Sequence, residues 1–416
     1  MYRRPNLRTS YSADSEIFPT YMQKGLIGLF GLILLLMPFD LPVINQIPVV
    51  RFLGDPEWIR PFTLVFAIGI AALGLNILSG VAGQVSLGHA FFMGVGASTA
   101  VLLGGESGTN TWGFGLPMWI WLPAAGFAAV VVGILVSPVA VRLRGLYLAI
   151  VTLGLVFLGI HFGNTTWGAK IAGAPALGRT FPDLTLKFWK EEDPIVDFSS
   201  DGKWFWFEVT EEQKRYFLYL LLLAVFAVVA KNLIRTRTGR ALQAIRDRDI
   251  AAEVMGVAEF KYKVIAFAIS SFFAGVGGAL LASHTGIMLA EQYNLFLSVE
   301  FIAILLIGGA GTVSGTLIGT FFVLMMPRFV EEMTRWLDGV EDGFWKPFAD
   351  FLLTGGDDFG IIHTSTVTPG WQLSVFDWNI VLFGALIVVF LIAEPLGLFG
   401  IWIKIRNYWK MWPFSY

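Results

Sequence analysis

Four polar side chains lie where two long apolar stretches of the sequence meet: Asn76, Gln84, Ser86 and His89. Their amide, hydroxyl and imidazole groups are suited to hydrogen-bonding a small polar solute. Such groups are costly inside a membrane, so they face either a solute path or a neighbouring helix. Four glycines accompany them, namely Gly80, Gly83, Gly88 and Gly94. We therefore expect a broken helix here, which either lines a path or packs tightly.

One acidic residue, Glu300, opens another apolar stretch. An ionised carboxylate at depth needs a partner, and His284, Arg328 or a backbone terminus could provide it. Glu300 would then act either as a packing brace or as a gate.

A seven-residue motif, Gly-x-Ala-Gly-x-Val-Ser, occurs at 80–86 and again at 308–314. An internal duplication would explain the shared positions, and so would convergent packing of small residues. The sequence leaves both explanations open.

Several kinds of catalytic site are absent from the sequence. There is no cysteine, and the four histidines form no HExxH motif or cluster, so no metal, disulfide or cofactor is expected. No GxSxG motif or aspartate pair indicates a hydrolase, and no GxxxxGKS/T loop is present to bind ATP. The net charge of −2 provides no basic field for nucleic acid. We expect a protein that is not itself an enzyme.

The segment GRALQAIRDRDIAAEVMG at 239–256 is the most informative polar stretch. Leu242, Ile245, Ala252 and Met255 recur at helical spacing with charged residues opposite, which predicts one amphipathic helix. Such a helix would lie on the membrane surface or dock on another protein, and its mixed charge favours the protein. The remaining alternative is a solvated linker.

Apolar stretches long enough to cross a bilayer must position these residues. Hydrophobic residues make up 56% of the 416 and charged residues 14%, which is typical of a polytopic membrane protein. A bilayer core of about 30 Å requires about 20 helical residues. We predict an all-α transmembrane helical bundle of about ten spans, with at least one helix broken by glycine. The expected spans are 22–37, 61–79, 86–104, 117–138, 145–162, 215–233, 261–284, 297–310, 313–327 and 378–393. The eighth and ninth could instead form one bent span or a re-entrant pair.

Basic residues in the loops predict the orientation. Eight lysines and arginines lie in 231–263, and loops rich in these residues stay on the cytoplasmic side. With ten spans, both termini then lie in the cytoplasm. Two long polar insertions, 164–214 and 328–377, fall outside and could form small caps.

Five blocks of sequence, in order, resemble the LivM-type permease subunit of branched-chain amino-acid ABC importers. SGVAGQVSLGHAFFMGVGA at 79–97 is the most specific block. The others are GLYLAIVTLG at 145–154, the A-A-x-x-x-G pattern of Ala251, Ala252 and Gly256, SVEFIAILLIGGAGTVSGTLIG at 298–319 and AEPLGLFGIW at 393–402. The family's leading Glu of the third block is Ile250 here, one position after Asp249.

The resemblance implies a permease that forms half of a solute path in the cell membrane. Its partners would be a second homologous permease subunit, two cytoplasmic ABC ATPase subunits and an extracytoplasmic solute-binding protein, all assembled at the lipid bilayer. The segment 239–256 would be the helix that docks on the ATPase. Its candidate coupling residues are Gly239, Arg240, Arg246, Asp249, Ala251, Ala252 and Gly256.

The same resemblance suggests a division of the chain. The parts are an N-terminal tail with the first span and outer loop (1–60), a permease core (61–336), an outer insertion (337–377) and a last span with a cytoplasmic tail (378–416).

The most direct expectation for the solute is a branched-chain amino acid. After GLYLAIVTLG, however, the family's acidic residue and TGG-x-x-G segment are absent, and IAGAPALG at 171–178 follows instead. A permease for urea or short amides therefore stays open. An ion-coupled secondary transporter would need paired carboxylates inside the membrane, for which Glu300 is a single candidate.

Overall fold

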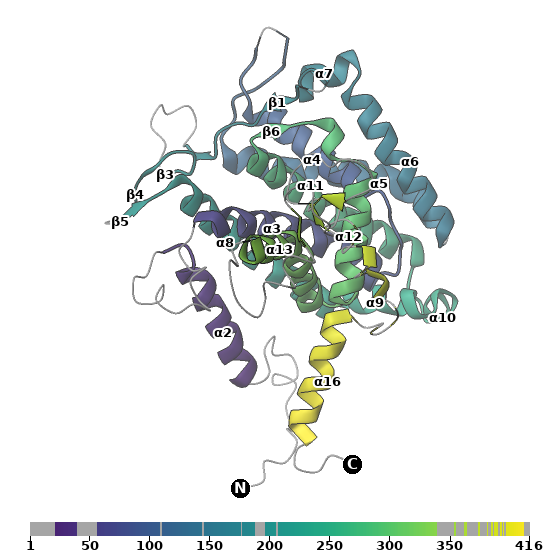
Figure 1. Cartoon of the computed structure of the whole chain (residues 1–416). Coiled ribbons are helices and arrows are strands. Elements are labelled where there is room, and N and C mark those ends of the chain that lie inside the picture. The colour runs from purple at the N-terminus through teal and green to yellow at the C-terminus, as the bar shows by residue number, and fades with distance from the viewer. Residues whose placement is uncertain are drawn as a thin grey trace.

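Helices dominate the chain in the computed structural model, which describes residues 21–39, 56–108, 110–143, 145–175, 177–187, 196–204, 207–338 and 397–411, with short pieces between 353 and 394 (Figure 1). The helices are α2 (Tyr21–Leu36), α3 (Pro56–Leu75), the π-helical turn η1 (Asn76–Val81), α4 (His89–Gly104), α5 (Met118–Arg142), α6 (Leu146–Gly163), α7 (Thr166–Ala172), α8 (Glu211–Arg235), α9 (Arg237–Asp247), α10 (Asp249–Val254), α11 (Glu259–Thr285), the 3-10 turn η2 (Ala290–Gln292), α12 (Leu295–Gly308), α13 (Val313–Asp338) and α16 (Gly397–Met411).

The strands are two or three residues long and do not build a layer of their own. They are β1 (Arg179–Thr180), β2 (Thr185–Leu186), β3 (Val196–Asp197), β4 (Gly202–Trp204), β5 (Phe207–Val209), β6 (Ile287–Met288), β7 (Leu353–Thr354), β8 (Ile362–His363) and β9 (Leu373–Ser374). The pairs β1–β6, β2–β3 and β4–β5 are antiparallel, whereas β7, β8 and β9 pair in parallel. The predicted helical bundle is thus confirmed, with small strand pairs added in the loops.

The number of spans differs from the expectation of about ten, which is not confirmed. Within the described residues, the stretches that are long and apolar enough to cross a membrane are Glu57–Val81, Met118–Val139, Glu211–Arg235, Glu259–Thr285, Ala290–Gly308 and Val313–Glu332. A seventh is added if α6 and α7, bent by 85°, count as one span.

The three other expected spans have different reasons for the mismatch. Helix α4 is short because Ser86–Gly88, at the start of the expected span 86–104, does not join it. Helix α2 covers the expected span 22–37 but is also short. Span 378–393 and the outer insertion 337–377 lie largely outside the described residues. Helices α12 and α13 are separate helices, and the stretches Ala290–Gly308 and Val313–Glu332 are each long and apolar enough to cross a membrane alone, which favours two spans.

Helix α11 forms the centre of the bundle, packed between α3, α4 and α5. Small residues make this contact close. A methyl group added at Gly96 of α4 would collide with the backbone of Gly275, and one added at Gly278 would collide with the backbone of Met93. Backbones that approach this closely gain van der Waals contact along the helices, which is a main source of helix association in a bilayer.

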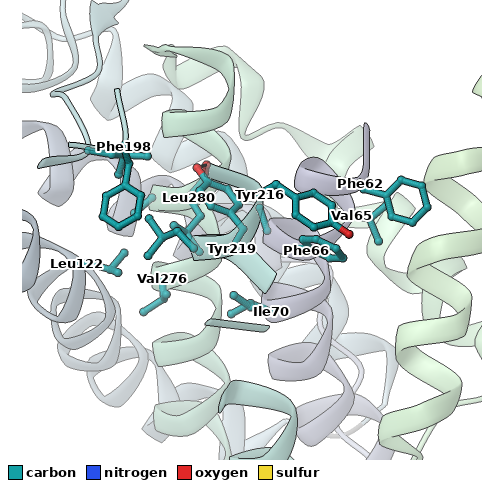
Figure 2. Close-up of a cluster of buried hydrophobic side chains, with 14 of the residues drawn as sticks. Phe62, Val65, Phe66, Ile70, Leu122, Phe198, Tyr216, Tyr219, Val276 and Leu280 are labelled. Carbon is teal, nitrogen blue, oxygen red and sulfur yellow. Dashed lines mark hydrogen bonds between the residues drawn. The ribbon is translucent and has the colours of Figure 1, made fainter. Parts of the chain in front are cut away.

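An aromatic cluster joins α8 to this centre. Figure 2 shows Tyr216 and Tyr219 of α8 against Phe66 of α3 and Leu280 of α11. The Tyr219 hydroxyl donates to the carbonyl oxygen of Leu280 at 2.8 Å, and the Tyr216 hydroxyl donates to that of Leu34 on α2 at 2.8 Å. Each tyrosine therefore contributes apolar area together with a satisfied polar tip.

The two ends of the bundle carry different elements. Figure 1 shows α9 and α10 at the lower right, and α7 with the β1–β6 pair at the top. We call the first the basic end, because it contains residues of the basic segment 231–263, and the second the strand end. Helix α7 and strand β1 of the insertion 164–214 thus lie at the end opposite to α9 and α10 of the segment 239–256 (Figure 1). Which end faces the cytoplasm stays a prediction.

Candidate functional site

The predicted helix break lies between α3 and α4 and is confirmed. Helix α3 passes into the turn η1, the chain then leaves helical conformation after Val81, and α4 begins at His89. The His89 Nε2 atom lies 2.8 Å from the carbonyl oxygen of Ala71, which is more than a helical turn before the end of α3. The loop 82–88 therefore turns back into the bundle, and α4 starts inside it.

Side chains from two distant helices satisfy the backbone at this break. The Leu87 amide donates to the Thr152 hydroxyl of α6 at 3.0 Å, and the Ala90 amide donates to the Ser298 hydroxyl of α12 at 3.1 Å. Free amides at a helix N-terminus are a ready site for a solute. Here these two are occupied by the protein, so they serve packing and not solute binding.

The four polar residues predicted at the break are all buried within the chain. Their exposed fractions are 0% for Asn76, 5% for Gln84, 1% for Ser86 and 1% for His89. Ser86 accepts a hydrogen bond from the Gly88 amide at 3.3 Å. The Asn76 Nδ2 atom and both polar atoms of the Gln84 carboxamide have no hydrogen-bond partner within the described residues. Of the four, Asn76 and Gln84 thus retain hydrogen-bonding capacity for a water or solute.

Glu300 lies half-buried on α12 and forms no ion pair or hydrogen bond with another described residue. The expected partner Arg328 instead pairs with acidic residues of α3 and α13, including Glu332 at 3.1 Å. The other expected partner, His284, lies near arginines, not near Glu300. Glu300 therefore has no partner among these residues with which to act as a packing brace. Its role as a gate stays a prediction.

The two copies of the Gly-x-Ala-Gly-x-Val-Ser motif contact each other. The Gly311 amide donates to the Asn76 Oδ1 atom at 2.7 Å, and a methyl group added at Gly80 would collide with the Gly311 amide. The fourth position of each copy, Gly83 and Gly311, is left-handed, with φ of +70° and +86°. Glycine adopts this conformation at no steric cost. The copies therefore share a left-handed φ at this one position as well as five residue types.

Arg246 joins this contact from the end of α9. Its Nη1 atom donates to the Gly80 carbonyl oxygen at 2.7 Å, and its side chain covers Gly83. We name the group of Asn76, Gly80, Gly83, Arg246 and Gly311 the glycine junction. The sequence placed Arg246 among the residues that dock a partner. Its Nη1 atom bonds within its own chain while the side chain stays 43% exposed, so a partner contact at Arg246 stays a prediction.

The segment 239–256 is two helices, not the single helix that the periodicity predicted. Helix α9 ends at Asp247, Arg248 is extended with φ −158° and ψ 96°, and α10 starts at Asp249. An acidic residue in the first turn stabilises a helix start, which favours a new helix at Asp249. The buried face of α9, including Leu242 and Ile245, packs against its own bundle. The remaining α9 candidates are Gly239, which is buried, and Arg240, which is exposed.

Helix α10 presents an exposed apolar face. The exposed fractions are 68% for Ile250, 81% for Val254 and 84% for Met255. Ala252, predicted to enter a partner's groove, is 5% exposed and faces its own chain, whereas Ala251 is exposed. We name Ile250, Val254 and Met255 the α10 face. Sequence analysis missed it, although the i,i+4 spacing of Ile250 and Val254 was a signal.

Gly256 ends this helix in the way that its position predicted. Its φ is +84°, its amide donates to the Glu253 carbonyl at 2.9 Å, and the Val257 amide donates to the Ala252 carbonyl at 3.0 Å. This pair of bonds is a Schellman motif, which favours glycine at the left-handed position. Gly256 thus shapes the end of α10 and has open space around it.

A second arginine organises the strand end. Arg179 is 8% exposed, and its guanidinium donates to the carbonyl oxygens of Trp112 at 2.6 Å, Glu106 at 2.8 Å and Ile171 at 3.2 Å. Burial lowers the pKa of Arg179 from its ordinary value because the charged form loses water. These bonds, which we name the Arg179 clasp, hold the loop after α4, the end of α7 and β1 together.

A cavity of about 450 Å³ lies between α4, α5, α6 and α7, away from the predicted polar residues. Its walls are mostly apolar, with Phe91, Val132 and Leu158 among them. The Thr99 and Tyr293 hydroxyls in its lining donate to backbone carbonyls of the protein. The cavity therefore offers little hydrogen bonding to a polar solute. Among the described residues, no three His, Asp or Glu side chains gather to hold a metal.

Comparison with known proteins gives a consistent result. A family described as "Branched-chain amino acid transport system / permease component" matches residues 59–355. The chain is similar to the high-affinity branched-chain amino acid transport system permease protein LivM of Escherichia coli, with 32% identity over 284 residues, 66% of this chain and 64% of that protein. LivM of Salmonella typhimurium is 32% identical over 67% of this chain and 64% of its own length. The guanosine ABC transporter permease protein NupQ of Bacillus subtilis is 28% identical over 54% of this chain and 67% of its own length.

The aligned part spans just under two thirds of the length of the two LivM proteins. No solved structure matches the chain.

Proposed function

This chain belongs to the family of permease components of branched-chain amino acid transport systems, and from that premise we propose that it forms half of the path of an ATP-driven importer. Its solute would be a small polar molecule, most directly a branched-chain amino acid. The path would be completed by a second, homologous permease subunit. Two ABC ATPase subunits would supply the energy, and an extracytoplasmic binding protein would deliver the solute.

The α10 face is the observation that carries this proposal. Ile250, Val254 and Met255 are apolar, more than two thirds exposed, and lie at the end of the bundle that carries the basic segment. Exposed apolar groups that gather on a charged surface mark a site for a partner protein. A helix of six residues is also too short to be stable alone, so a partner that buries it adds to its stability. An ATPase subunit at the cytoplasmic side fits this site.

The outer surfaces of the helices fit a lipid bilayer. Large apolar side chains are exposed along three helices, for example Val131 and Leu135 on α5, Phe157 on α6 and Val225 on α8. Lipid tails would cover these residues. The basic end then faces the cytoplasm, and the strand end, held by the Arg179 clasp, faces the binding protein.

Charge placed on the α10 face tests the ATPase partner. The variant Ile250→Asp with Val254→Asp should insert normally and still recover the second permease subunit, because no span changes. It should reduce recovery of the co-expressed ATPase subunits at least about tenfold, since two apolar anchors become charged. Affinity purification of the variant measures how much of the second permease subunit and of the ATPase subunits it recovers. The rate of ATP hydrolysis by the purified complex checks its ATPase content. A matched control is Leu177→Asp, which charges a residue 79% exposed at the strand end.

Full ATPase recovery by the double variant would remove the support for this docking site. Loss of recovery in the Leu177 control as well would point to general damage. The assembly itself would be wrong if the unaltered chain recovered no ATPase under conditions that preserve other ABC importers.

A neutral amide solute is the second candidate. The Gln84 carboxamide has a donor and an acceptor free within the described residues, and that pair is complementary to urea or a short amide. Uptake of labelled leucine into reconstituted vesicles, with unlabelled urea and acetamide as competitors, separates the two solute classes.

A further inference from the structure

Arg246 sits where the docking segment meets both glycine motifs. It occupies the last turn of α9, two residues before the extended link to α10. Its Nη1 atom donates to the Gly80 carbonyl of the first motif at 2.7 Å. The same atom lies 3.2 Å from the place where a side chain would begin at Gly311 of the second motif. One guanidinium thus bonds the first motif and lies beside the second.

The contact is close enough to depend on glycine. A methyl group added at Gly83 would lie 2.5 Å from the Arg246 Cγ atom. On the other side of the junction, the Gly311 amide is fixed by its 2.7 Å bond to Asn76 Oδ1. The two motifs therefore form one packed unit, and Arg246 fills the space that the missing side chains leave.

The chain on either side of Arg246 connects this unit to the α10 face. Helix α9 packs against α8, α11 and η1, so a displacement of α9 alters its contacts with the bundle. The α10 face follows only four to nine residues after Arg246. A force applied there by a partner thus reaches Arg246 through one short extended link. The guanidinium then acts on η1 through the Gly80 carbonyl and on the loop before α13 beside Gly311.

We propose that Arg246 is a positioning residue that transmits movement of the docking segment to the two glycine motifs and so links ATP hydrolysis to solute movement. This rests on the importer function proposed above. Transmission of movement requires a contact that is both strong and local. A charged donor bonded to a backbone carbonyl oxygen, as in Arg246, is both. The rival interpretation is that Arg246 only braces α9.

Arg246→Ala in the complete importer separates these interpretations. The full complex would be reconstituted in vesicles with its binding protein, and uptake of labelled leucine would be measured together with ATP hydrolysis. Recovery of ATPase subunits should stay normal, because the α10 face is intact. The number of solute molecules moved per ATP should fall about tenfold, as expected when a coupling contact is lost. Arg246→Lys, which keeps a charged donor, should restore part of this ratio.

Arg237→Ala is the matched control. It removes the same charge from an exposed residue in the first turn of the same helix, away from the glycine junction. Its ratio of solute to ATP should equal that of the unaltered chain. A lower ratio there would mean that charge loss anywhere on α9 has the effect, which would overturn the proposal.

Two results for Arg246→Ala would also overturn it. One is an unchanged ratio. The other is a parallel fall of uptake, ATP hydrolysis and complex yield, which is what a brace predicts. If this variant does not assemble, Arg246→Lys decides by the same ratio, and an unchanged value overturns the proposal. Failure of the importer function itself is distinguishable, because then the unaltered chain would recover no ATPase.

Discussion

Arg179 and Arg246 both donate to backbone carbonyl oxygens, yet they hold opposite ends of the bundle in different ways. Arg179 is 8% exposed and reaches three carbonyls at 2.6 to 3.2 Å. The Arg246 side chain is 43% exposed and reaches one carbonyl, at 2.7 Å. Three buried bonds must break together, whereas a single bond beside water can be exchanged for solvation. The strand end is therefore held more firmly than the contact that Arg246 makes at the basic end.

The largest expected effect is the loss of the Arg179 clasp. Arg179→Leu would leave three carbonyl oxygens without their donor and should lower the free energy of unfolding by about 3 kcal/mol or more. The unfolding temperature in detergent, followed by size-exclusion fluorescence, measures this. Lys170→Leu removes a charge at the same end, where the amine lies 5.1 Å from the Trp112 ring. That control should cost only about 0.5 to 1 kcal/mol. Equal losses in both would break the comparison.

The next effect concerns the basic end and uses two glycines in the same backbone conformation. Gly83→Ala and Gly256→Ala each place a side chain at positive φ, which costs about 1 to 2 kcal/mol. At Gly83 the new methyl group also meets Arg246, whereas at Gly256 it meets open space. Gly83→Ala should therefore lose more stability than Gly256→Ala, and only Gly83→Ala should reduce the solute moved per ATP. The same ratio for both would show that the glycine junction adds nothing beyond backbone strain.

The smallest effect on stability is expected at Gln84. Its carboxamide is buried and has no partner within the described residues, so Gln84→Leu removes an unsatisfied group and should change stability by less than about 1 kcal/mol. Uptake should nevertheless fall if the carboxamide contacts the solute. Asn76→Leu is the contrast, because it strips the Gly311 amide of its acceptor and should destabilise the protein. Unchanged uptake in the Gln84 variant would assign that residue to packing.

The long apolar stretches could be predicted from the sequence because their length is a direct consequence of bilayer thickness. The boundary of α4 could not be predicted, since it depends on tertiary contacts: the Leu87 amide before α4 bonds the Thr152 hydroxyl, and the Ala90 amide in its first turn bonds the Ser298 hydroxyl. The division of 239–256 was missed for a similar reason. Its helical spacing continues through Arg248, and the break follows from how α9 packs on the bundle.

The candidate site shows the same limit. Residue type identified Asn76, Gln84, Ser86 and His89 as unusual in an apolar setting. It could not show that Ser86 and His89 have their partners inside the chain. It also could not show that Arg246 bonds the Gly80 carbonyl, since a sequence does not reveal which way a guanidinium points. Two residues of the α10 face, Ile250 and Val254, were hidden because they lie on the polar side of the predicted single helix, opposite Met255.

The capping of α4 has a consequence for how this protein is made. The amide of Ala90 depends on the hydroxyl of Ser298, which the ribosome adds 208 residues later. At typical synthesis rates that interval is roughly 10 to 40 s. During this time the start of α4 has left the ribosome without one of its caps, so a newly inserted amino-terminal half cannot close its broken helix by itself. Completion of this early helix therefore waits for a late one.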